Sequence, residues 1–372
     1  MDAAVDKRAT GIDAPGNGGA NMNPGFLSVI AATPKDRLGL FLATANQLGT
    51  SLQNVEKDFL VCWVLDLLFN GREITEPRLL FKGGTSLSKA YGLISRFSED
   101  IDITVFREDI GQDIEISDLE RLSGKQQRIR LGAIKQACQT YIQGALKERL
   151  NLQIETVFRE AGISAIQEAV VSDVDDHDQQ TLLIRYPATT TEVEDYVRPT
   201  VKIEAGAKSA LDPHRQTIIK PYIADEITGA NLAVENIVTI DAERTFWDKV
   251  VILHGLRRWH DNRGQLRQQG HRISRHYYDI YKLTQSEMGQ RAKRNHMLAI
   301  DCARHAQMFF NSADLDLKSA RPGSFALATT PEMIDALRRD YQAMSGMIFG
   351  EVPDFTIVIN EIRELEQQIN QL

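Results

Sequence analysis

The stretch that decides the fold runs from Phe81 to Val105 and reads FKGGTSLSKAYGLISRFSEDIDITV. An apolar segment at 79–81 predicts a short strand that leads directly into two adjacent glycines. A helix is predicted over 86–95 and a second strand over 100–106. These twenty-five residues therefore predict a strand, a glycine turn, a helix and a returning strand.

The second strand carries two carboxylates on one face. Asp100 and Asp102 alternate with Ile101 and Ile103, and a strand sends alternate side chains to opposite faces. Two such carboxylates repel each other unless a divalent cation lies between them. Mg²⁺, or Mn²⁺ in its place, takes hard oxygen ligands of this kind, so the pair is a candidate metal site. The alternative is a polar strand face turned to solvent.

The glycine turn adds a candidate phosphate site beside these acids. Glycines let a backbone approach a ligand closely, and the following hydroxyl residues can cap a helix whose N-terminal amides favour phosphate. Ser98 lies two residues before the first aspartate and can add a further hydroxyl. The predicted nucleotide-binding residues are Lys82, Gly83, Gly84, Thr85, Ser86 and Ser98.

A third carboxylate fits the same chemistry. In VKIEAG, residues 201–206, Glu204 alternates with apolar neighbours and leaves a predicted strand on a polar face. We expect it to complete the metal site or to act as a base. An ordinary exposed strand glutamate is the alternative.

The composition sets the broad class of protein. The chain has 372 residues and a net charge of −8, so a nucleic-acid partner needs a local basic patch. It has no apolar stretch that could span a membrane, and its polar N-terminus lacks the apolar core of a secretion signal. Cys62, Cys138 and Cys302 are too far apart for a disulfide framework or a zinc site. We therefore expect a cytoplasmic protein.

Three regions follow from the pattern along the chain. Residues 1–34 are predicted to be a disordered or loosely tethered arm. Residues 35–230 are predicted to form one α+β domain and 231–372 a helical C-terminal domain that contributes to the active-site cleft, with helical patterning from about 235 onward.

Within the first domain we expect a sheet of about five strands. Besides the two strands around the glycine turn, these lie over 152–159, 181–186 and 200–205. The acidic run SDVDDHDQQ, residues 172–180, is interpreted as a solvated hairpin turn, because it lacks the glycine that a calcium loop needs.

These motifs together resemble the AbiEii/AbiGii-type toxin family of the nucleotidyltransferase superfamily, which also includes MenT-type toxins. The resemblance rests on FKGGTSLSKAY and RFSEDIDI, preceded by VEKDF, and extends to VKIEAGAKS, ERTFWDKVVILH and SRHYYDIYKL. It covers roughly residues 50–285. It implies a polymerase-beta-type α+β fold: a mixed sheet with flanking helices, followed by the helical C-terminal domain.

The resemblance also assigns two residues of the second half. Lys249 inherits the role of the family's phosphate-neutralising lysine, and Asp279 that of an aspartate needed for activity. Asp279 would orient Lys249 or the incoming nucleophile. The sequence departs from the family pattern at His276, where the family usually has Asp. A simple salt bridge between Lys249 and Asp279 is the alternative.

A basic tract lies between these two residues. Residues 254–276 contain six arginines and one acid, in an acidic protein, and such a tract can hold an RNA backbone with Trp259 for stacking. The candidate RNA-binding residues are Arg257, Arg258, Arg263, Arg267, Arg272 and Arg275. A solvated arginine-rich loop is the alternative.

The resemblance implies a Mg²⁺-dependent nucleotidyltransferase toxin that uses a nucleoside triphosphate. Related toxins add nucleotides to the 3′ end of tRNA and block translation, as part of a toxin–antitoxin or phage-defence pair with a cognate antitoxin. Two alternatives remain. One is a protein nucleotidyl- or phosphotransferase with the same site, and the other is a non-catalytic protein that kept the fold.

Overall fold

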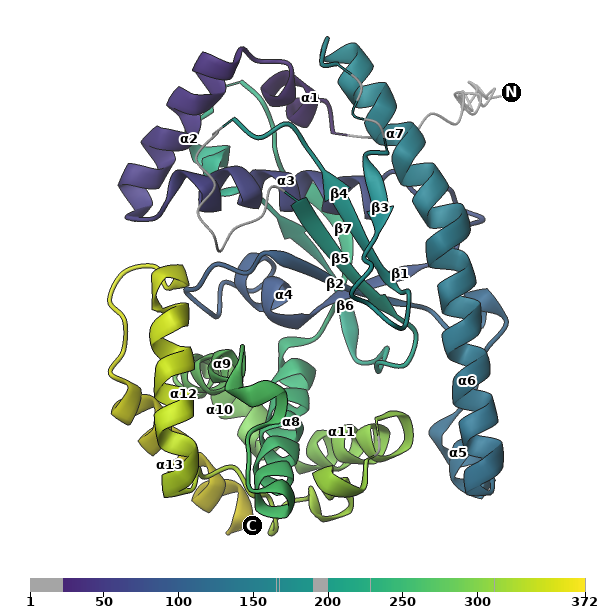
Figure 1. The fold of residues 1–372 in the computed structure, drawn as a ribbon, viewed down its shortest axis with the longest axis vertical. Helices are drawn as coiled ribbons and strands as arrows, with labels where there is room; N and C mark the ends of the chain where they lie inside the picture. Colours follow the sequence, from purple (N-terminus) through teal and green to yellow (C-terminus); the bar gives the residue numbers. More distant parts are fainter. Residues whose placement is uncertain are drawn as a thin grey trace, which may run out of the picture.

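A mixed β-sheet forms the centre of the N-terminal part of the molecule (Figure 1). The computed structural model describes residues 23–164, 166, 168–189, 200–227, 229–310 and 312–371. In these ranges seven strands pair in the order β3-β4-β5-β2-β1-β7-β6. Their bounds are β1 Leu79–Lys82, β2 Asp100–Val105, β3 Val170–Ser172, β4 Thr181–Arg185, β5 Thr200–Gly206, β6 His214–Ile219 and β7 Val234–Ile240.

The register of the central strands places the predicted acids side by side. β2 runs antiparallel to β1 and parallel to β5. In the parallel pair Asp100 lies opposite Lys202, and Asp102 lies opposite Glu204. Neighbouring strands are only about 4.8 Å apart, so residues in register on the same face meet in one place.

Helices cover the sheet and then form a second body. The bounds are α1 Pro24–Ile30, α2 Pro34–Leu48, α3 Leu52–Phe69, α4 Gly83–Lys89, α5 Ile116–Arg121, α6 Gly124–Tyr141, α7 Lys147–Glu160, α8 Ala242–Arg263, α9 Ser274–Thr284, α10 Glu287–Arg294, α11 His296–Phe309, α12 Pro331–Met344 and α13 Phe355–Asn370. Figure 1 shows α8 to α13 gathered on one side of the sheet, and α6 and α7 running on as one long rod. The sheet region and the helical region each have their own hydrophobic core.

Helix α3 is buried along almost its whole length and fixes the segments around the glycine turn. It packs against β2, β5 and β7, and the Ser51 side chain caps its first turn. Two of its charged residues, which a buried helix tolerates only when they are paired, reach toward the turn. Lys57 Nζ lies 2.5 Å from Glu99 Oε2, and Asp58 Oδ1 lies 2.6 Å from Lys89 Nζ at the end of α4. The VEKDF segment therefore ties down the residue before Asp100 and the helix after the turn.

Several predicted elements are confirmed, and others are corrected. The strands at 79–81, 100–106, 181–186 and 200–205 are present, and 172–180 is a hairpin turn between antiparallel β3 and β4. The strand predicted over 152–159 is wrong, because this segment belongs to helix α7. The apparent alternation used Leu152, which is 60% exposed. The buried face of α7 instead contains Leu150, Ile154, Val157 and Phe158, at helical spacing.

The predicted helical start of the C-terminal domain is also corrected. Residues 234–240 form strand β7, which pairs with β1 and β6, so the helical region begins at Ala242. Asn236 has a positive φ of 60°, and the pairing with β6 carries a register shift. This irregularity leaves Val234 and Ile237 buried three residues apart, a spacing that imitates a helix.

The predicted N-terminal arm ends earlier than expected. Residues 24–30 form α1, whose Phe26, Val29 and Ile30 are buried in the core of the sheet region. Asn23 caps this helix, and its backbone N–H donates to Asp66 Oδ2 at 2.8 Å. Residues 1–22 lie outside the described part of the chain.

The described helices include no candidate for a membrane span. None of them combines the length and the apolar character that crossing a bilayer requires.

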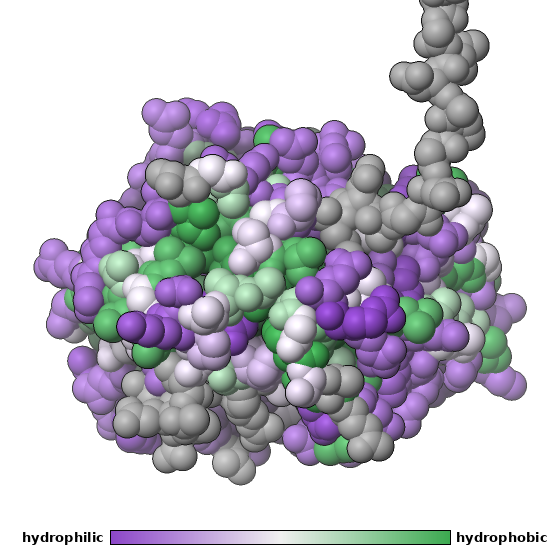
Figure 2. Space-filling view, turned by 90° about the horizontal axis from the view of Figure 1, so that it is seen from above, coloured by the Kyte–Doolittle hydropathy of each residue, from purple (hydrophilic) through white to green (hydrophobic). Residues whose placement is uncertain are grey.

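On the face seen from the top of Figure 1, hydrophobic side chains gather toward the middle within a hydrophilic rim (Figure 2). Cys62, Cys138 and Cys302 are free and buried.

Candidate active site

Asp100 and Asp102 face a large cavity between the sheet and the helical region. Along β2 the side chains of Ile101 and Ile103 are fully buried, while the two aspartates are only partly buried. The predicted period-two alternation is therefore present. The cavity has a volume of about 1180 Å³, and Asp100, Asp102 and Glu204 line it together with residues of α6, α8 and α11.

The charge around Asp100 is strongly negative. Burial raises the pKa of Asp100 to about 6, and the nearby carboxylates of Glu99 and Glu204 add to this shift. Arg272 opposes it from 3.7 Å. The other aspartate, Asp102, has Lys82 Nζ at 3.6 Å. A carboxylate whose pKa is raised by its neighbours gains from a bound cation, so the electrostatics favour a metal ion here.

The acids are better suited to a metal ion that binds together with its substrate than to a metal ion held entirely by protein ligands. Glu204 lines the cavity, but its carboxylate pairs with Lys202 at 2.9 Å. Among the described residues, no three His, Cys, Asp or Glu side chains converge to hold an ion. Mg²⁺ commonly binds through one or two carboxylates plus substrate phosphates and waters. The pair Asp100 and Asp102 satisfies this requirement without a third protein ligand.

The two glycines are required by the side chains that pack against them. Gly83 has φ +80°, and a Cβ at this position would lie 2.0 Å from Asp102 Oδ2. A Cβ on Gly84 would lie 2.7 Å from Arg96 Nη2. Both glycines line the cavity, as the phosphate prediction requires. Their first structural consequence, however, is to let Asp102 and Arg96 come close to the turn.

The hydroxyl residues divide between the cavity and the interior. Ser98 lines the cavity, as predicted. Thr85 and Ser86 are fully buried and do not line it, so we correct their predicted contact with phosphate. The Thr85 hydroxyl donates to Ser98 Oγ at 2.8 Å and is close to the Asp100 carbonyl, while Ser86 Oγ donates to the Gly83 carbonyl. They hold the turn against β2.

Lys249 and Asp279 meet as the resemblance implied, and a third residue joins them. Lys249 Nζ lies 2.9 Å from Asp279 Oδ2, and Lys249 lines the cavity. Arg96 donates two hydrogen bonds to the same carboxylate, at 2.7 and 2.8 Å, and also lines the cavity. The salt bridge between Lys249 and Asp279 is therefore present, and Lys249 also lines the cavity, while its catalytic role stays a prediction.

The pKa values of this buried trio are set by burial and by the charges that its members exert on one another. Burial alone would raise the pKa of Asp279, but Arg96 and Lys249 outweigh it and hold that pKa well below its ordinary range. Burial lowers the pKa of Lys249, the nearby Arg96 adds to this shift, and Asp279 opposes it. The sequence analysis missed Arg96. Its only signal was its place two residues before Ser98, within RFSEDIDI.

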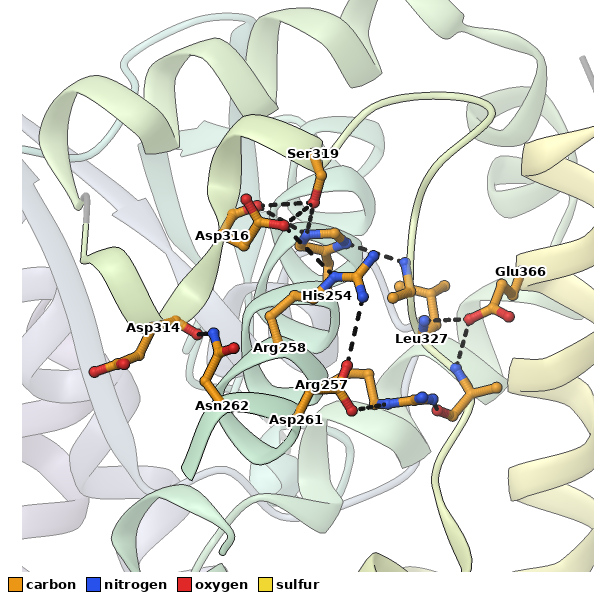
Figure 3. A network of polar contacts seen from close by, with 12 residues as sticks. His254, Arg257, Arg258, Asp261, Asn262, Asp314, Asp316, Ser319, Leu327 and Glu366 are labelled. Atoms are coloured by element: carbon orange, nitrogen blue, oxygen red, sulfur yellow. Dashed lines mark hydrogen bonds and ion pairs between the residues drawn. The ribbon is translucent and has the colours of Figure 1, made fainter. Parts of the chain in front are cut away.

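The basic tract 254–276 does not form one arginine surface. Its first part is the C-terminal half of α8, and Figure 3 shows Arg257 and Arg258 pointing to Asp261 in a local network. Arg263 pairs with Asp314 at 2.6 Å. These three arginines therefore have acidic partners on the surface, and their predicted role as RNA contacts stays a prediction.

The remaining arginines of the tract lie at the active site. Arg267 and Arg275 line the cavity, and Arg267 also lies 5.6 Å from the Trp259 ring centre. Arg272 donates to Glu99 at 2.6 Å. For Arg275, no acidic group within the described ranges lies at ion-pair distance. Of the six arginines, Arg267 and Arg275 are therefore the two that line the cavity.

His276 also lines the cavity, and its ring nitrogen Nδ1 is buried without a hydrogen-bond partner among the described residues. Burial, together with Lys249 and Arg275, keeps its pKa well below the ordinary value. His276 is therefore a neutral hydrogen-bonding group in the active site.

Comparison with known proteins identifies the family of the chain. Residues 66–368 match the family described as "Nucleotidyl transferase AbiEii toxin, Type IV TA system". Among solved structures, the chain is similar to MenT4, a nucleotidyltransferase toxin from Mycobacterium tuberculosis H37Rv, with 14% identity, a TM-score of 0.40 and coverage of 89% of this chain and 98% of that one. The search of curated proteins finds no match. The family match spans most of the chain, so this protein belongs to the AbiEii family of nucleotidyltransferase toxins, the toxins of type IV toxin–antitoxin systems.

Proposed function

We propose that the protein transfers a nucleoside monophosphate from a nucleoside triphosphate to RNA, at the 3′ end of tRNA, with Mg²⁺ as the metal. The observation that carries the proposal is that the Asp100–Asp102 pair, the Gly83-Gly84 turn and Lys249 line one cavity. Transfer to tRNA would block translation and growth. The protein would act in the cytoplasm, where its substrates are, as the toxin of a growth-arrest or phage-defence pair restrained by a cognate antitoxin.

The residues divide into a carboxylate side and a cationic side. Asp100 and Asp102 would hold the metal, which when bound neutralises phosphate charge and polarises the phosphoryl oxygens. Lys249, Arg96 and Arg275 line the same cavity and would supply positive charge to the triphosphate. The Asp279 carboxylate keeps Lys249 and Arg96 in fixed positions, so little reorganisation is needed when charge develops.

The reaction is an in-line displacement at the α-phosphorus. The oxygen of the acceptor hydroxyl forms the new bond to this phosphorus, the bond to the β-phosphate bridging oxygen breaks, and pyrophosphate leaves with that electron pair. The hydroxyl proton passes to Glu204, which lines the cavity, or to water. Positioning and charge neutralisation supply most of the rate.

The test is a labelling experiment with the purified protein. Each of the four α-labelled nucleoside triphosphates is incubated with Mg²⁺ and either total tRNA or total protein. We expect label in tRNA, removed by chelation and absent in Asp102→Asn. Asp178→Asn, which removes a carboxylate from the exposed hairpin after β3, is the matched control and should retain activity. Label found only in protein would overturn the RNA proposal and favour a protein nucleotidyltransferase.

A further inference from the structure

The cavity has a second wall that the phosphate-transfer residues do not occupy. Helix α6 forms one side of it with Arg128 and Leu131, and the end of α11 forms the other with His305 and Phe310. Lys208 lines it from the loop after β5. We call these five residues the α6–α11 wall. Helix α5, which precedes α6 in the chain, is joined to α11 by the Arg304–Glu120 ion pair.

His305 presents a buried polar atom that lacks a partner. The side chain is 5% exposed, and its ring stacks on Phe309 with centroids 4.5 Å apart and planes 16° from parallel. Its Nε2 has no hydrogen-bond partner among the residues that the structure describes. Leaving such a group unpaired costs about 1–3 kcal/mol, so a ligand that supplies a partner is favoured. Burial, with Arg244 and Arg107, lowers the pKa of His305 to about 3, so the ring is neutral.

Phe310 adds an open aromatic surface to the same wall. It follows directly after α11 and remains 49% exposed, although it is a large apolar side chain. An aromatic ring left open in a cavity lined by cations is suited to stacking with a nucleobase, because every base has a π-face.

The basic residues of the wall are available for phosphate. No acidic group within the described ranges lies at ion-pair distance from Arg128 or Lys208, in contrast to the paired arginines of α8. Arg107 fixes the loop that carries Lys208, because its guanidinium donates to the carbonyls of Ala207 and Ser209 at 3.0 and 2.7 Å. The same guanidinium lies 4.9 Å from the centre of the Phe309 ring, which supports His305. One partly buried cation therefore contacts both the loop that carries Lys208 and the Phe309 ring.

We propose that the α6–α11 wall binds the single-stranded 3′ end of the RNA acceptor. A base stacks on Phe310, His305 Nε2 meets a polar edge of that base, and Arg128 and Lys208 hold the adjacent backbone phosphates. This inference rests on the proposed function, because it names where the RNA acceptor of that reaction lies. In this proposal the α6–α11 wall, and not the arginines of α8, makes the main contact with the RNA acceptor.

The experiment measures RNA binding in the absence of nucleoside triphosphate, so that no transfer takes place. Fluorescence anisotropy of a labelled single-stranded RNA of about twelve nucleotides, within the usual site size for such proteins, gives the dissociation constant. We expect Phe310→Ala to weaken binding at least about fivefold, from the loss of one stacked base. His305→Phe keeps the stack and removes the ring nitrogen, and should weaken binding about two- to tenfold.

The charge contribution has a matched control. Arg128→Gln with Lys208→Gln should lower the slope of log affinity against log salt by about 1.4, as expected for two phosphate contacts to a single strand. Arg258→Gln with Arg263→Gln removes the same number of charges from the paired network of α8. This control should leave both affinity and slope within about twofold of the wild type.

The outcomes separate this inference from the proposed function. If the wild type does not bind the RNA, if Phe310→Ala binds normally, or if the α8 control weakens binding as much as the wall variant, the wall is not the acceptor site. Transfer of label to tRNA would then still support the proposed function. If instead the wall variants lose RNA binding but label never enters RNA, the wall stands as an RNA site and the proposed reaction fails.

Discussion

Gly83→Ala tests most directly whether the glycine turn and Asp102 act as one unit. The new Cβ would lie 2.0 Å from Asp102 Oδ2, and ordinary contact begins near 3.4 Å. The carboxylate must therefore retreat by about 1.4 Å, or the turn must move. A misplacement of about 1 Å at a reacting centre can cost on the order of 100-fold in rate. We expect kcat for nucleotide transfer to fall by about that factor or more.

A second glycine provides a matched control. Gly92 also has a positive φ, of 61°, but a Cβ there would meet no atom within 4 Å. Both substitutions force alanine into the left-handed region at about 1–2 kcal/mol, partly offset by about 0.4–1 kcal/mol from a less flexible unfolded chain. Gly92→Ala should therefore lose about 1 kcal/mol of stability and keep kcat within about threefold of the wild type.

The two variants are compared per folded molecule. Urea unfolding gives the stability of each, calorimetric titration with Mn²⁺ gives the metal affinity, and labelled transfer to RNA gives kcat. The reasoning predicts that Gly83→Ala loses both metal affinity and kcat beyond its loss of stability. If its kcat lies within threefold of that of Gly92→Ala, the close approach of Asp102 is not needed, and the reasoning is refuted.

Three further predictions concern the charges around the cavity. Asp279→Asn leaves Arg96 and Lys249 buried without their counter-charge and should cost about 3–5 kcal/mol of unfolding free energy at pH 7. Because the folded-state pKa of Asp279 is depressed, this stability is present above about pH 4 and is lost on acidification through the folded pKa, so the two proteins should converge in acid. Asp100→Asn should act in the opposite direction: the raised pKa, about 6, makes the metal-free wild type lose stability between about pH 4 and pH 6. At pH 7 in the presence of a chelator, Asp100→Asn should be more stable to unfolding than the wild type by about 2–3 kcal/mol. Equal stability of the two proteins would contradict the raised pKa of Asp100. Arg272→Gln removes a cation that lies 3.7 Å from Asp100, and the attraction between these two charges is worth about 1 kcal/mol at the dielectric of water. Calorimetry should therefore show Mn²⁺ binding that is about fivefold tighter in this variant.

The part of the site that the sequence could predict is the part set by local geometry. The alternation of Asp100 with Ile101 depends only on the period of a strand, and it is present in the structure. The glycine pair marks a turn for equally local reasons. By contrast, Leu152 misled the prediction of a strand, because an exposed leucine in an amphipathic helix has the same local pattern as an alternating strand.

The roles of charged residues could not be predicted, because they depend on partners far away in the chain. Arg96 pairs with Asp279, which lies 183 positions later, and Glu99 joins Lys57 of α3 to Arg272 of the helical region. Arg263 looked free in the sequence because its partner Asp314 lies about fifty positions beyond it, whereas Asp261, the partner of Arg257 and Arg258, lies within one helical turn of them. Burial and pairing decide whether a cation can bind a substrate, and neither can be read directly from the amino-acid sequence.

These long-range pairs imply that the site is assembled by contact between the two regions of the molecule. The sheet region supplies Asp100, Asp102 and Arg96, whereas the carboxylate that holds Arg96 comes from α9 of the helical region. Without that contact Arg96 would lose its carboxylate partner. Its guanidinium, which packs against Gly84, would then no longer be held in place. Since Asp279 also holds Lys249 of α8, one buried carboxylate positions one cation from the sheet region and one from the helical region. A perturbation that separates the regions should therefore remove the cationic side of the site while leaving the carboxylate pair on β2 intact.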